Sequence, residues 1–112
     1  MAKAYGGSGQ DFAQSISKTS DDGYIIAGNA SSNNGDVSGN HSSSDDAWVM
    51  KIDASGNKLW SKLFGGLHGD YFQSVIDAGD GSYAIAGNTL SNDGDISSNK
   101  GMTDVWVMIY KP

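Results

Sequence analysis

The residues best suited to bind a metal ion occur in two polar loops of similar sequence. Oxygen-bearing side chains fall at positions 1, 3 and 5 of each loop, and an aspartate falls at position 12. Ca²⁺ prefers about six to eight oxygen ligands on a flexible loop, and EF-hand loops use a similar spacing. Calcium binding is therefore one interpretation, and structural turns of the Asx-Gly-Asp type are the other. The metal candidates are Asn34, Asp36, Ser38 and Asp45 in the first loop and Asp93, Asp95, Ser97 and Asp104 in the second.

Aromatic and amide side chains offer a second kind of chemistry, the binding of sugars. Apolar sugar faces stack on aromatic rings, and sugar hydroxyls need paired donors and acceptors. Large aromatic side chains equally suit packing between sheets, so both interpretations stay open. The sugar-binding candidates are Trp48, Trp106, Tyr24, Tyr83, Asn29, Asn88, Asp36 and Asp95.

Catalysis has little support in this sequence. Cysteine is absent, and no nucleophile motif or glycine-rich loop before a helix occurs. The two histidines, His41 and His68, are not equivalent in the repeat described below. We therefore expect a protein that is not an enzyme.

The candidate residues come in pairs because the chain contains an internal repeat, two units of nearly the same sequence. Asp11 matches Asp70 and Tyr24 matches Tyr83 at an offset of 59 residues, and the offset falls to 58 before Trp106, which matches Trp48. A period in this range indicates a repeat architecture whose units must stack on neighbours. Asp11 and Asp70 follow a double glycine in each unit, and we expect their carboxylates to accept backbone N–H groups of the adjacent loop.

Each unit reads as four short antiparallel strands with almost no helix. Alternating apolar runs are separated by turn sequences such as Gly79-Asp80-Gly81. Four-stranded units at this period predict the blades of a β-propeller, and a β-sandwich is the alternative. The predicted strands are 47–53, 58–64, 71–77, 82–88 and 105–110, with matching strands in the first unit.

The order of the strands predicts closure between chains. Residues 2–7 align with the end of a fourth strand, residues 8–66 form one complete blade, and residues 67–112 hold only three strands of a second. We expect residues 3–5 of one chain to pair with residues 106–110 of the next, since such exchange protects sheet edges. Three chains would give six blades, which we favour, and four chains would give eight. A piece of a longer array is the alternative.

The charge and composition narrow the range of partners. Seven basic against 13 acidic side chains give a net charge of −6 and a pI near 4.4, so nucleic acid and anionic membranes are expected to be repelled. No apolar run reaches the roughly 18 residues of a membrane span, and the N-terminal residues lack a signal-peptide core. Either the protein stays inside the cell or a leader has been removed.

The repeated motif resembles the β-propeller repeats of bacterial extracellular proteins known as SBBP-type repeats. The resemblance rests on residues 59–66, Asp70, residues 80–89 and residues 104–107, and on the same order of residues in the first unit. It implies an extracellular or cell-surface location and a binding or scaffold role. We therefore expect a homo-oligomeric, multivalent binding module with glycans as ligands. A structural repeat module without a small-molecule ligand is the alternative.

Overall fold

The fold consists of β-strands alone in the part of the chain that the structure describes. The computed structural model describes residues 2–37, 45–91, 93–96 and 101–112. No helix in these residues is long and apolar enough to cross a membrane. The strands are β1 (Asp11–Lys18), β2 (Tyr24–Ala30), β3 (Asp46–Ile52), β4 (Lys58–Phe64), β5 (Asp70–Asp77), β6 (Tyr83–Thr89) and β7 (Asp104–Tyr110).

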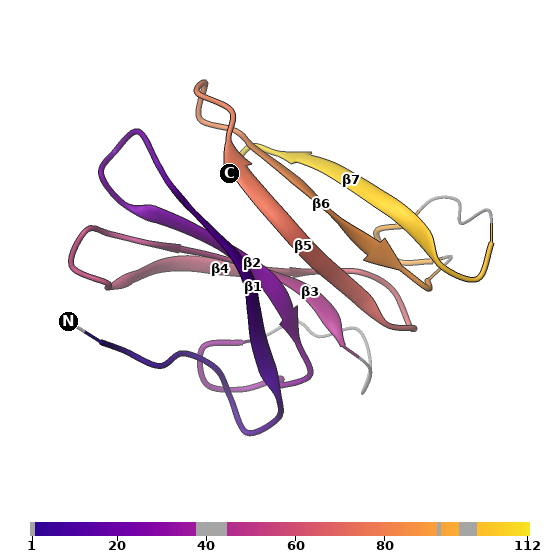
Figure 1. The fold of residues 1–112 in the computed structure, drawn as a ribbon. Helices are drawn as coiled ribbons and strands as arrows, with labels where there is room; N and C mark the ends of the chain where they lie inside the picture. Colours follow the sequence, from indigo (N-terminus) through magenta and orange to yellow (C-terminus); the bar gives the residue numbers. More distant parts are fainter. Residues whose placement is uncertain (1, 38–44, 92, 97–100) are drawn as a thin grey trace.

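The strands form two antiparallel sheets that lie one against the other (Figure 1). Sheet 1 has the order β1-β2-β3-β4, and sheet 2 has the order β5-β6-β7. The all-β fold and the strands predicted from the alternation are confirmed to within about a residue of their ends. Two packed sheets are compatible with the sandwich alternative as well as with two blades of a propeller.

Short turns join β1 to β2, β3 to β4 and β5 to β6, and their sequences suit a tight turn. In the β5–β6 connection, Ala78 N–H donates to the Ser82 carbonyl over 3.0 Å. Gly79 and Gly81 have φ values of +91° and +86°, a region that glycine enters without steric cost. The predicted hairpin turn is therefore confirmed.

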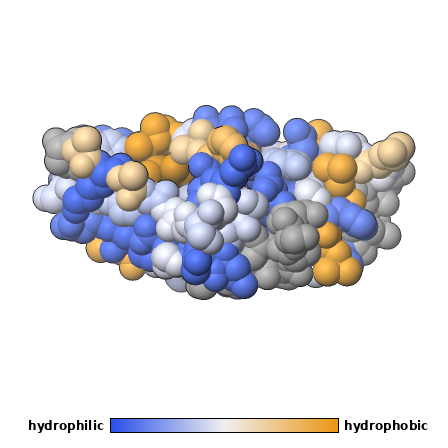
Figure 2. Space-filling view, turned by 90° about the horizontal axis from the view of Figure 1, so that it is seen from below, coloured by the Kyte–Doolittle hydropathy of each residue, from blue (hydrophilic) through white to orange (hydrophobic). Residues whose placement is uncertain are grey.

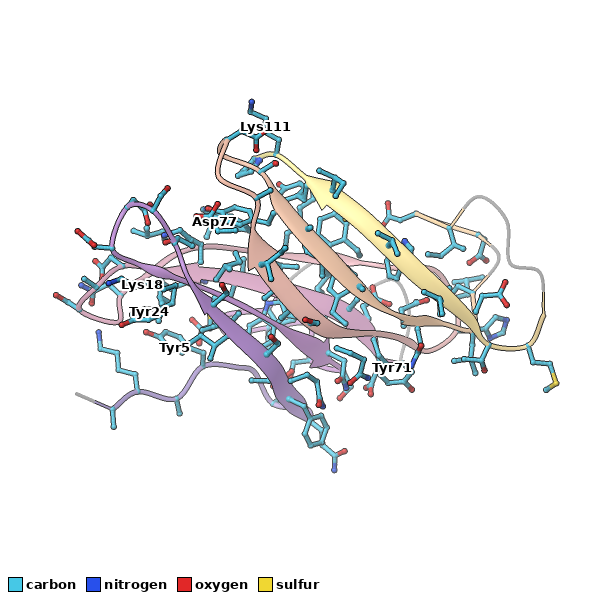
Figure 3. The ribbon with its side chains drawn as sticks, turned by 45° about the horizontal axis from the view of Figure 1, so that its top comes forward. Tyr5, Lys18, Tyr24, Tyr71, Asp77 and Lys111 are labelled. Carbon is cyan, nitrogen blue, oxygen red and sulfur yellow. The ribbon has the colours of Figure 1, made fainter. Side chains whose placement is uncertain are left out.

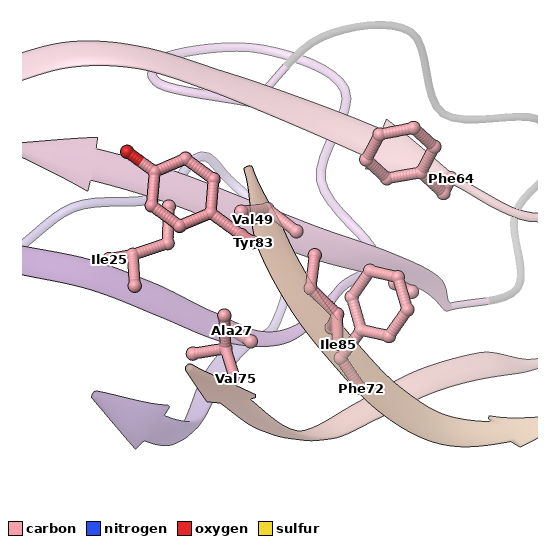
Figure 4. Packing of buried hydrophobic residues seen from close by; sticks show 9 residues of the cluster. Ile25, Ala27, Val49, Phe64, Phe72, Val75, Tyr83 and Ile85 are labelled. Atoms are coloured by element: carbon pink, nitrogen blue, oxygen red, sulfur yellow. The ribbon is translucent and has the colours of Figure 1, made fainter. Parts of the chain in front are cut away.

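The main core lies between the two sheets. Sheet 1 contributes residues such as Ile25 and Val49, and sheet 2 contributes residues such as Phe72 and Ile85 (Figure 4). We call the two faces that pack here the inner faces, and the opposite ones the outer faces. Successive side chains of a strand point to opposite faces of the sheet. Because apolar residues occur at both odd and even positions of these strands, each sheet has two apolar faces. A second cluster, around Trp48, Met50 and Leu63, lies on the outer face of sheet 1.

Each sheet carries a β-bulge in its first strand at the same place. The register shifts between Ala13 and Ser15 in sheet 1 and between Phe72 and Ser74 in sheet 2. A Cβ atom at Gly28 or at the matching Gly87 would clash with a carbonyl oxygen of the bulged strand. The repeat thus preserves the bulge together with the glycine that makes room for it.

Residues 2–7, predicted as a fourth strand of a neighbouring blade, form no strand within the single chain. The segment runs beside sheet 1, whereas β7 lies on the far side of sheet 2 (Figure 1). A strand is defined by its hydrogen-bonded partner, and the strand predicted to pair with these residues belongs to another chain. The expected strand exchange therefore stays a prediction.

Replacing Gly87 by Ala is expected to lower the free energy of unfolding by about 1–3 kcal/mol, because the added methyl group must displace the backbone of the bulge. Urea unfolding followed by circular dichroism measures the change. Gly101→Ala is the matched control, since a Cβ there meets its nearest atom at 3.4 Å. An unchanged midpoint for Gly87→Ala would show that the bulge yields freely.

Candidate functional site

The double-glycine loop that precedes the first strand of each sheet is held by an aspartate. Gly7 N–H donates to Asp11 Oδ2 over 3.0 Å, and Gly66 N–H donates to Asp70 Oδ2 over 2.9 Å. Asp70 also accepts the Thr89 hydroxyl at Oδ1 over 2.6 Å. The structural role predicted for Asp11 and Asp70 is confirmed.

The Asx-Gly-Asp loops bind the same double-glycine segments from the other side. Asp36 Oδ2 accepts Gly6 N–H over 3.0 Å, and Asp95 Oδ2 accepts Gly65 N–H over 2.9 Å. The first residue of each loop acts likewise. Asn34 Oδ1 accepts Ser8 N–H over 2.8 Å, and Asp93 Oδ1 accepts Leu67 N–H over 2.9 Å. These four side chains therefore fix backbone, as structural Asx residues do.

The calcium interpretation stays a prediction. Ser38 and Ser97 lie outside the described residues, and within the described ranges no three acidic or histidine side chains form a metal-ligating group. Asp45 Oδ2 accepts the Asn29 amide over 2.9 Å. In sheet 2, Asp104 lies opposite Thr89 in the strand register. The equivalent of Thr89 in sheet 1 is Ala30, and Ala30 lies opposite Asp46. The structural equivalent of Asp104 is therefore Asp46, so the two aspartates at position 12 do not occupy matching backbone positions.

The sugar-binding candidates divide between the two sheets. Trp106 lies on the inner face of sheet 2, where its ring packs 5.0 Å from that of Phe72, and Tyr83 is buried in the same core. Asn29 is buried on the inner face of sheet 1, whereas Asn88 lies on the outer face of sheet 2, between Tyr71 and Val105 in the register. The sequence predicts two similar sites, one in each repeat. In each repeat the tryptophan and the tyrosine share one face of the sheet, whereas the asparagine lies on the opposite face.

Trp48 and Tyr24 lie on the outer face of sheet 1. Tyr5 packs on the same cluster, near Tyr24 (Figure 3). A cavity of about 330 Å³ opens on this face, and Tyr5, Trp48 and Met50 contribute to its lining. The Trp48 ring is 7% exposed, and its Nε1 atom has no hydrogen-bond partner among the described residues. This face is therefore mostly apolar, with isolated polar atoms.

The free edge of β7 contains residues 106–110, which the sequence analysis predicts to pair with residues 3–5 of another chain. In sheet 1 the corresponding strand, β3, is paired on both sides, whereas β7 pairs only with β6 in the described chain. A groove of about 420 Å³ runs along β7, and its outward side chains Val105, Val107 and Ile109 are exposed. The signal in the sequence was the uninterrupted apolar run 105–110, which is typical of a strand buried on both faces.

The burial of Lys51 is a feature that the sequence analysis missed, since a lysine within a strand suggests exposure. Its side chain is 3% exposed on the inner face of sheet 1, and its Nζ atom lies 3.0 Å from Asp21 Oδ1. A hydrogen bond from the Thr19 hydroxyl, followed by that from Lys51, lowers the pKa of Asp21 to about 2. The buried ammonium group is thus paired, as burial of a charge requires.

A comparison with models of known protein families finds no match, and a comparison with curated proteins finds no similar sequence. The geometry of the described chain offers two apolar outer faces and the edge of β7, whose equivalent in sheet 1 is covered by β4. Such features suit the binding of another β-sheet.

Replacing Asp21 by Asn is expected to remove part of the acid sensitivity of the fold. Because the folded-state pKa lies below the usual 3.8, ionised Asp21 stabilises the protein above about pH 4, and this contribution is lost as the pH falls towards 2. Urea midpoints between pH 6 and pH 2.5 should therefore fall more steeply for the wild type than for Asp21→Asn. Asp22→Asn serves as the neighbouring control, and equal slopes for all three proteins would contradict the assignment.

Proposed function

We propose that this chain is a non-catalytic, self-assembling binding module that completes a β-propeller from several copies. Residues 2–7 of one copy form the fourth strand beside β7 of the next copy. The observation that carries the proposal is the unpaired edge of β7, whose equivalent β3 is covered by β4. Three copies, giving six blades, are the favoured ring, and four copies are the alternative. The assembly has no need of nucleic acid or membrane.

The register of the added strand follows from that between β3 and β4. There, Ala47 lies opposite Phe64 and Trp48 lies opposite Leu63. Transferred to the second sheet, this register sets Tyr5 opposite Val105 and Ala4 opposite Trp106. The added strand would occupy the groove along β7 and satisfy its outward N–H and C=O groups.

The segment that must be donated is already held in a suitable place. Gly6 and Gly7 bind Asp36 and Asp11 on sheet 1 by the same hydrogen bonds through which Gly65 and Gly66 bind Asp95 and Asp70 on sheet 2. Residues before Gly65 belong to the preceding sheet, as β4 does. By the same relation, residues 2–5 belong beside the sheet that precedes sheet 1, which is sheet 2 of another copy.

The ligands that we propose for the assembled ring are extracellular glycans. Each copy carries two versions of the polar loops and aromatic strands, so a ring would present several similar weak sites. Several weak contacts with a glycan-coated surface give a much tighter overall attachment when the spacing of the sites fits. The acidic charge of the chain, −6, favours neutral ligands over phosphates.

The strand exchange predicts that the wild type has a solution mass three times that of the 11.7 kDa chain, measured by light scattering after size exclusion. Ala4→Pro should reduce the mass to that of one chain, because proline removes an N–H and restricts the preceding residue. Ala4→Val keeps the N–H group and should leave the mass unchanged. An assembled Ala4→Pro protein would refute pairing through this segment.

The glycan proposal predicts that the assembled wild type binds at least one neutral glycan on an array, and that monomeric Ala4→Pro binds it at least about tenfold more weakly, since avidity is lost. The measurement is made with calcium and with chelator. Silence across diverse sugars in both conditions would leave the structural, ligand-free module as the function.

A further inference from the structure

We propose that the outer face of sheet 2 in one copy packs on the outer face of sheet 1 in a second copy, in the manner of the contact between the two sheets within one chain. The inference deepens the proposed assembly and rests on it. It adds a face-to-face interface to the exchanged strand and names the residues that form it.

The outer face of sheet 2 is the repeat equivalent of the inner face of sheet 1. Val49 on the inner face of sheet 1 is 0% exposed, whereas its equivalent Val107 is 65% exposed. The neighbouring equivalents behave alike, since Ala47 is buried and Val105 is exposed. Sheet 2 therefore presents an apolar surface of a kind that sheet 1 buries.

Conversely, the outer face of sheet 1 is the repeat equivalent of the inner face of sheet 2. Val75 on the inner face of sheet 2 is 3% exposed, whereas its equivalent Ile16 on the outer face of sheet 1 is 61% exposed. Ile26, which lies opposite Ile16 in the register, is the equivalent of the buried Ile85. Each chain thus carries one copy of both halves of its own internal interface. The half on sheet 2 is exposed, and the half on sheet 1 is covered only in part, where Tyr5 packs on the cluster around Trp48 and Met50.

The cavity on the outer face of sheet 1 marks where the second copy would pack. Its lining residues Ala13, Trp48 and Met50 are equivalents of residues that face the core between the sheets. Ala13 has only a methyl group where Phe72 has a ring, which leaves room on this face. On the opposing surface, Val105 is larger than its equivalent Ala47.

Charge also favours this contact. Within the chain, Asp77 at the end of β5 accepts Ser20 N–H over 2.8 Å, across the two sheets. The equivalents of Asp77 and Ser20 are Lys18 and Gly79, so the same arrangement between copies brings Lys18 next to the turn that contains Asp80. A lysine and an aspartate then face each other at the edge of the interface, where an exposed ion pair contributes modestly to affinity but favours one orientation.

Figure 2 shows the molecule from below, with hydrophobic residues in a few separate patches on a mostly hydrophilic surface. Covering apolar patches is the main driving force for association. Because the two contacting faces differ, the interface is heterologous, and it closes only through a ring. We assign a second copy of this chain as the partner, because each outer face matches one half of the contact that the two sheets make within one chain.

The test uses two variants. Ile16→Glu places a charge on the outer face of sheet 1, and Val107→Glu places a charge on the outer face of sheet 2. Both positions are mostly exposed in the single chain, so the folded monomer should tolerate the charge, as circular dichroism checks. Each variant alone should have the mass of one chain. An equimolar mixture should form a one-to-one dimer and stop there, because only the intact sheet 2 of Ile16→Glu and the intact sheet 1 of Val107→Glu can meet.

Leu67→Glu is the matched control, since Leu67 is 57% exposed outside both faces, and it should keep the mass of the wild type. Wild-type mass for Ile16→Glu or Val107→Glu alone would overturn the interface, and so would a mixture that stays monomeric. If these variants still assemble while Ala4→Pro does not, strand exchange stands and the face-to-face contact falls. If the mixture dimerises but the array is silent, the interface stands and the glycan proposal falls.

Discussion

The organisation of this protein depends on one constraint, which is that both of its sheets are apolar on both faces. Burial of the inner faces against each other forms the core that holds the chain together. The outer faces remain, and within the described residues only the N-terminal segment and its own cluster cover part of one of them. Hydrophobic surface of this kind is the usual mark of association. The proposed assembly buries the outer faces by the same packing that the two sheets use within one chain.

Backbone anchoring by acidic and amide side chains is the second level of organisation. The double glycines allow the loop to approach the sheet closely, since a side chain at Gly6 or Gly65 would meet the aspartate that binds the next residue. Aspartates are abundant in this chain, and the described ones mostly accept N–H groups of nearby backbone. An excess of carboxylates therefore serves loop structure here before any ligand is considered. The negative net charge follows from that use.

The strands and turns could be predicted from the sequence because their signals are local. Alternation gave β4 its observed bounds, and Gly79-Asp80-Gly81 specified a hairpin turn. The face on which Trp106 or Tyr83 lies could not be predicted, because β6 and β7 are apolar on both alternations and only the neighbouring sheet decides which face is inner. The burial of Lys51 could not be predicted either, because its partner Asp21 lies 30 residues away in a turn. The loop aspartates at position 12 were misaligned by one residue at the point where the two loops differ in length.

The two loop anchors differ in one detail. Asp70 accepts the Thr89 hydroxyl at Oδ1, whereas the first repeat has Ala30 at that place, and Asp11 Oδ1 has no hydrogen-bond partner among the described residues. A buried acceptor left in this way costs about 1–3 kcal/mol. The N-terminal loop is therefore the part of the fold with the smaller local free energy of opening, and its amides are the less protected against exchange with solvent. The segment that we propose to pair with another chain is thus attached through the less firmly hydrogen-bonded of two otherwise matching loops.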